Sequence, residues 1–136
     1  MNRRDFIRVS ALGLTGSMLV PKSVLASTKS GMAGGVYYTK DAPGRWSQKV
    51  GGHMPVVEVS GKTVKVTTPH EMRGYEHYIV KHMVLDADYQ FIAEKMFDPS
   101  KDSTPFSEYE LADYSGKIYV LSVCNKHDTW LASAEV

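Results

Sequence analysis

The sequence contains only one cysteine, Cys124, and no excess of charge of either sign. A lone cysteine cannot form a disulfide within the chain, so the fold does not depend on one. The 16 Lys and Arg residues are balanced by 15 Asp and Glu residues, and the net charge is +1. Because the sequence has no basic stripe and no acidic block, it argues against nucleic acid as a partner.

Alanine- or leucine-rich helical periodicity is absent from the later part of the chain, where Val, Tyr and Thr are frequent. This composition favours β-structure. Short apolar segments separated by turn residues predict strands over 56–59, 63–68, 78–85, 89–97, 106–111 and 117–124. We therefore expect an all-β fold, an antiparallel β-sandwich of about seven strands, with no convincing helix.

Long apolar runs are also missing. The run Val9–Val20 is too short and too rich in Gly and Ser to span a bilayer, so no stable membrane anchor is expected once the signal is removed. With Arg3 and Arg4 before it, this segment resembles a bacterial twin-arginine export signal, although an ordinary basic signal region is the alternative. We expect a periplasmic location. The predicted organisation is an export signal (1–26), an N-terminal arm (27–47) and one domain (48–136).

Metal-binding residue types do occur. Cys124 ends the last predicted strand, and His127 follows three residues later. A thiolate and an imidazole at this spacing can close on one iron, copper or zinc ion, because the chain turns between them. The alternative is a small buried thiol beside an unrelated histidine. The other histidines in loops or at strand edges are His53, His70 and His77, whereas His82 lies inside a strand and is expected to be a packing residue.

Three motifs carry a resemblance to a known family. They are His53-Met54-Pro55-Val56-Val57, His70-Glu71-Met72 followed by His77-Tyr78-Ile79, and Cys124-Asn125-Lys126-His127 with Trp130. In this order they resemble the superoxide reductases, which comprise the neelaredoxins and the iron domain of desulfoferrodoxins. The resemblance runs from about Trp46 to Trp130.

The resemblance implies an immunoglobulin-like sandwich holding one non-haem iron that reduces superoxide to hydrogen peroxide. An external small electron-donor protein would re-reduce the iron. Carried over by motif, Cys124 would be the axial ligand. The equatorial ligands would be His53, His70, His77 and His127. The chain has no Cys-x-x-Cys pair for a second iron, and the sequence leaves a homo-oligomer possible.

The sequence departs from the family pattern next to the first histidine. The family usually has a Glu-Lys pair there, to cap ferric iron and to attract the anion, whereas this chain has Gly51 and Gly52. Glu71 is a weak candidate to replace the glutamate and Lys49 to replace the lysine. Arg73 and Lys126 are further candidates for attracting the anion.

Three other interpretations stay open. Without the Glu-Lys pair, the chain could be an iron electron-transfer or redox-sensing protein that lacks fast superoxide turnover. A copper carrier also combines a β-sandwich with Cys-x-x-His, but no methionine follows His127 and four histidines are too many. The third is a structural or adhesive sandwich without a metal.

Overall fold

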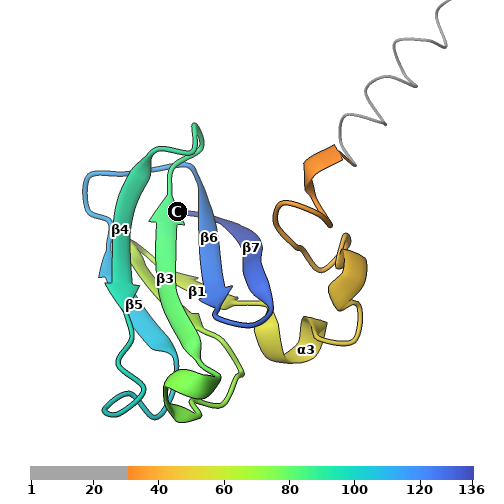
Figure 1. The fold of residues 1–136 in the computed structure, drawn as a ribbon. Helices are drawn as coiled ribbons and strands as arrows, with labels where there is room; N and C mark the ends of the chain where they lie inside the picture. Colours follow the sequence, from red (N-terminus) through yellow and green to blue (C-terminus); the bar gives the residue numbers. More distant parts are fainter. Residues whose placement is uncertain (1–30) are drawn as a thin grey trace, which may run out of the picture. The chain divides into compact units, whose positions relative to one another are not determined.

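Seven strands in two antiparallel sheets make up the core of the computed structural model, which describes residues 31–136 (Figure 1). The strands are β1 (Val56–Ser60), β2 (Thr63–Thr67), β3 (Ile79–Leu85), β4 (Phe91–Met96), β5 (Phe106–Glu110), β6 (Lys117–Cys124) and β7 (Asp128–Glu135). One sheet has the order β1-β2-β5 and the other β4-β3-β6-β7. The predicted all-β sandwich of about seven strands is confirmed.

The predicted export signal lies outside the described residues. Residues 33–136 form one compact unit. Within the described part of the chain, no helix is long and apolar enough to cross a membrane.

Besides two single-turn 3₁₀ helices, Gly44–Trp46 and Gly74–Glu76, two elements were not predicted. The first is β7, which pairs with β6 along its whole length, from Lys117↔Glu135 to Cys124↔Asp128. The second is a short helix, α3 (Val50–His53), in a segment expected to be a loop. Its Gly51 and Gly52 are poor helix formers, which is why the sequence did not indicate it.

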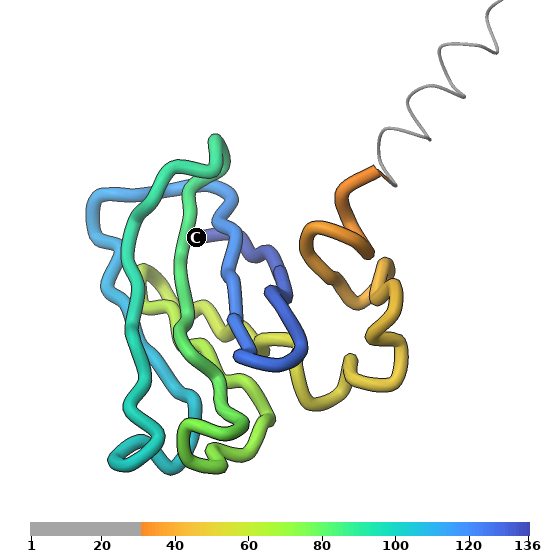
Figure 2. Tube along the Cα trace, in the orientation of Figure 1, coloured from red at the N-terminus to blue at the C-terminus, as the bar shows by residue number. Residues whose placement is uncertain are grey.

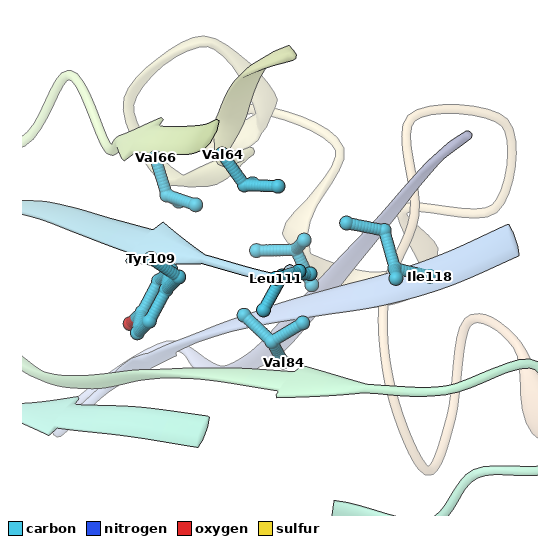
Figure 3. Packing of buried hydrophobic residues seen from close by; sticks show 7 residues of the cluster. Val64, Val66, Val84, Tyr109, Leu111 and Ile118 are labelled. Atoms are coloured by element: carbon cyan, nitrogen blue, oxygen red, sulfur yellow. The ribbon is translucent and has the colours of Figure 1, made fainter. Parts of the chain in front are cut away.

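Side chains of the two sheets meet in a core between them. Val64 and Val66 of β2 point toward Val84 of β3 and Ile118 of β6 (Figure 3). Along β6 every second residue is buried, from Ile118 through Val120 and Ser122 to Cys124. This period of two places the thiol at the end of the strand's core-facing row.

His82 lies inside this core, as its position in a strand predicted. Its ring is fully buried, with Nε2 2.8 Å from Thr68 Oγ1 and Nδ1 2.7 Å from Ser107 Oγ. Thr68 Oγ1 also pairs with Ser122 Oγ at 2.7 Å. Because both ring nitrogens are hydrogen bonded, His82 has none free for a metal.

The segment before α3 packs against β7. The N–H of Tyr38 donates to the carbonyl of Thr129, and the N–H of Leu131 donates to the carbonyl of Tyr38. The Tyr38 ring is buried 5.6 Å from that of Trp130, which has no exposed surface. Figure 2 follows the trace from this segment through α3 into β1.

The stability of the protein should depend on the pH through His82. Burial lowers the pKa of this imidazole from 6.5 to about 4. Between these values the unfolded chain binds a proton that the folded chain does not. The free energy of unfolding therefore falls with falling pH, by at most about 1.4 kcal/mol per pH unit from this residue.

The variant His82→Gln, which can still hydrogen bond to the neighbouring hydroxyls, should show a shallower dependence. Urea unfolding of the metal-free protein and the variant, from about pH 7.5 down to about pH 4, measures the difference. Equal slopes for the two chains would contradict the prediction.

Candidate metal centre

Four imidazoles form a closed ring of neighbours. His53 Nε2 lies 3.1 Å from His127 Nδ1, which lies 3.2 Å from His77 Nε2, and this atom lies 3.1 Å from His70 Nε2. Ring centroids of adjacent members, including His53 and His70, are 4.5–5.0 Å apart, while His53 and His77 are 6.3 Å apart across the ring. Two nitrogens bound at right angles to one metal at about 2.1 Å would be about 3.0 Å apart, so these separations suit ligands of one ion.

Backbone carbonyls determine the protonation of two of these rings. His53 Nδ1 lies 2.8 Å from the Lys49 carbonyl oxygen, and His70 Nδ1 contacts the Glu71 carbonyl oxygen. A carbonyl only accepts, so each Nδ1 carries the hydrogen and each neutral ring has a lone pair on Nε2. Both lone pairs belong to nitrogens that face another imidazole of the ring, as metal-ligating histidines require.

His127 Nδ1 has more close neighbours than hydrogen bonds can satisfy. Besides the nitrogens of His53 and His77, Cys124 Sγ lies 3.6 Å away. One ring nitrogen carries either one hydrogen or one lone pair, so it cannot pair with all three. A cation placed between these atoms could accept a lone pair from each of them. The residues present therefore fit a bound metal.

Burial favours the neutral form of three of these imidazoles, those of His53, His77 and His127. It is the main cause that lowers the pKa of His53 to about 4, despite the hydrogen bond to the Lys49 carbonyl. The pKa values of His77 and His127 are also lowered, again chiefly by burial and then by neighbouring cations and imidazoles. Neutral imidazole is the form that binds a metal.

The structure brings the five predicted ligands together, four of them in one compact group and the fifth beside it. The ligand atoms of His53, His77, Cys124 and His127 all lie within 4.8 Å of one another, so these four could hold a metal ion. His70 is outside that group and joins it through its contact with His77. The thiol is 3% exposed.

A three-residue hairpin loop brings His127 back to Cys124. Cys124 pairs with Asp128, so residues 125–127 connect β6 to β7. Asp128 has a φ of +64°, a left-handed conformation that such loops require and that Asp tolerates better than most residues.

Asn125 ties this loop to the segment that carries His77. Its side-chain nitrogen donates to the carbonyls of Tyr75 (3.3 Å) and Glu76 (3.0 Å), and its side-chain oxygen accepts from the N–H of Tyr78 (3.0 Å). Its own N–H donates to the Tyr78 carbonyl at 3.2 Å. The amide therefore fixes two ligand-bearing loops relative to each other.

The charged candidates from the sequence lie around the cluster. The backbone carbonyl of Lys49 accepts a hydrogen bond from His53. The exposed ammonium of Lys49 lowers the pKa of His127, although burial is the larger cause. Lys126 acts in the same direction on His77 and His127. Glu71, which is exposed, forms an ion pair with Arg73 at 3.3 Å.

The glycines that replace the Glu-Lys pair leave space beside the cluster. A Cβ at Gly51 would meet nothing within 4 Å, and one at Gly52 would meet only the Pro69 carbonyl oxygen at 3.6 Å. Neither glycine has a positive φ. Larger side chains would therefore fit at both positions.

Two residues at the cluster had no role in the sequence interpretation. Trp46 packs edge-on against the His127 ring, with centroids 4.7 Å apart and planes at 90°. Asp128 accepts a hydrogen bond from the Trp46 indole. No local sequence signal could have paired them, because 82 positions separate them.

Neither a protein-family model nor a curated protein sequence matches the chain. Solved structures do. The superoxide reductase (neelaredoxin) from Ignicoccus hospitalis is 24% identical, with a TM-score of 0.60 over 76% of this chain and 95% of its own. The superoxide reductase (1Fe-SOR) from Giardia intestinalis is 18% identical, with a TM-score of 0.55 over 62% and 98%.

The chain has the superoxide reductase fold. At these identities the likeness establishes the fold alone. The capacity for a metal rests on the His and Cys cluster found on that fold.

On this superoxide reductase fold, replacing Asn125 should weaken metal binding. Asn125→Ala removes all three side-chain hydrogen bonds between the two ligand-bearing loops. Because such supporting contacts orient the ligands, we expect the metal affinity to fall by about 10- to 100-fold. Competition with a chelator measures the affinity. Glu94→Gln, in β4, is the control, and equal affinities for the two variants would contradict the prediction.

Proposed function

We propose that this protein binds one iron ion through His53, His70, His77, Cys124 and His127 and reduces superoxide to hydrogen peroxide. The observation that carries the proposal is the convergence of four imidazole nitrogens and a buried thiol on one point. On two of the rings, those of His53 and His70, a backbone carbonyl leaves the converging nitrogen unprotonated. The superoxide reductase fold supports it. When bound, iron would supply the single electron that, with two protons, converts superoxide to hydrogen peroxide.

The residues suit an anionic substrate. With iron bound, neutral imidazoles would contribute no charge and Cys124 would contribute one negative charge as a thiolate, so ferrous iron would leave the site with a net positive charge. Lys49 and Lys126 add positive charge near His127. Opposite charges raise the rate of encounter with a small anion, and salt should reduce this effect.

Other parts of the proposal come from the sequence alone. An external small electron-donor protein would return the electron, since the chain has no Cys-x-x-Cys pair for a second iron. The twin-arginine export signal, the periplasmic location and a homo-oligomer stay predictions.

The metal and its thiolate ligand can be tested together. We expect the purified protein to contain a single iron per chain and, when oxidised, to show a visible absorption band from thiolate-to-iron charge transfer. Cys124→Ser should lose this band, because an alkoxide or hydroxyl replaces the thiolate. Metal analysis and the optical spectrum measure both.

Glu94→Gln is the control for that test, because Glu94 is an exposed residue of β4 paired with Lys81 and its replacement should leave the band unchanged. Copper or zinc in place of iron, or a band that survives in Cys124→Ser, would overturn the proposed centre.

A second candidate function is one-electron transfer or redox sensing at the same iron, without fast superoxide turnover. The observation that favours it is the absence of any charged side chain at Gly51 and Gly52. The two candidates differ in the second-order rate constant with superoxide, which pulse radiolysis measures. A slow reaction of the iron-loaded protein would favour the second.

The glycines make a gain-of-function test feasible. Gly52→Lys places an ammonium where the structure leaves space, and it should raise the superoxide rate constant several-fold at low salt. Gly52→Gln, similar in length but neutral, should not. The gain should shrink as salt is added. An equal effect of both variants would show that charge at this position does not attract the substrate.

A further inference from the structure

Asp128 combines an unfavourable backbone conformation with an unusual set of side-chain contacts. Among the non-glycine residues that the structure describes, only Asp128 and Tyr89 have a positive φ. The Asp128 carboxylate accepts two hydrogen bonds on Oδ2, from the Trp46 indole Nε1 at 2.8 Å and from Arg45 Nη2 at 2.6 Å. Both donors come from the segment before α3, more than 80 positions earlier in the chain.

Through Trp46, these contacts reach a predicted metal ligand. The Trp46 ring is held by its N–H on Asp128 and stands perpendicular to the His127 ring, 4.7 Å away. The Arg45 guanidinium lies 4.4 Å from the centre of the same indole ring. The indole is therefore fixed from two sides while it limits the rotation of His127.

The ion pair itself does not explain this arrangement. The side chains of Arg45 and Asp128 are 65% and 41% exposed, and exposed ion pairs contribute little to stability. The part-buried hydrogen bond from Trp46 is the contact that acts on the cluster. His127 is also the residue whose Nδ1 meets three other ligand atoms, so its orientation matters most.

We propose that Asp128 is a positioning residue for the metal centre. Its carboxylate holds Trp46 against His127, and that contact keeps the imidazole in the orientation in which it binds and retains the metal. The inference rests on the proposed metal centre and adds to it a residue that is not one of the five proposed ligands.

The decisive variant is Asp128→Gly. Glycine adopts the left-handed conformation without strain, so the backbone of the loop is preserved while the carboxylate is lost. We expect iron to be lost to the chelator ferrozine about 10-fold faster or more than from the unmodified protein. The ferric EPR spectrum should also change, because the His127 ring is free to turn.

Three further variants separate positioning from general stability. Trp46→Phe keeps a ring but removes the N–H, and should reproduce the faster iron loss. Asp128→Asn keeps one acceptor oxygen, and should be intermediate. Glu94→Gln removes another exposed ion pair, with Lys81, and should leave iron loss and the EPR spectrum unchanged.

The outcomes distinguish this inference from the proposed function. An unmodified chain that binds no iron would overturn both. An unmodified chain that retains iron, with Asp128→Gly matching Glu94→Gln in iron loss and EPR spectrum, would overturn the role of Asp128 alone. If Asp128→Gly does not fold, Trp46→Phe decides in the same way.

Discussion

The ligand atoms of four histidines and one cysteine converge on one point, and the surrounding loops must hold them there. Three short contacts meet at His127 Nδ1, and two of the facing imidazoles have their lone pairs directed by backbone carbonyls. Such a set is unfavourable by itself, because lone pairs oppose one another and few hydrogens are available between them. A cation turns the same set into a favourable one, and binding of a metal would then stabilise the folded chain.

The sandwich supplies these atoms from elements that are far apart in the sequence. Alternation along β6 delivers Cys124 at the end of a row of buried residues, and the hairpin to β7 returns His127 to it. The segment after β2 delivers His70, the segment before β3 delivers His77, and α3 delivers His53. Each predicted ligand is held by a regular element or by a loop whose backbone is hydrogen bonded, and such support keeps the geometry of a metal site fixed.

Charge around the cluster is arranged by the loops rather than by the core. Two lysines lie near His127, and the space at Gly51 and Gly52 is open. The cluster thus keeps residues that could hold a metal ion, while the side chains next to His53 differ from the family pattern. The proposed superoxide reduction depends on positive charge in this region more than the alternative redox function does. Substitutions at Gly52 change that charge.

The fold class could be predicted from the sequence, because alternating strands and turn residues are local features. The Cys124–His127 spacing indicated a metal-binding pair, and the full ligand set came from the family resemblance. Other features depend on contacts between distant parts of the chain. β7 has one fully buried residue, Trp130, and forms because β6 pairs with it. α3 forms despite two glycines, with His53 hydrogen bonded to the Lys49 carbonyl. The contact of Asp128 with Trp46 spans 82 positions, a separation at which local propensity carries no information and only packing brings residues together.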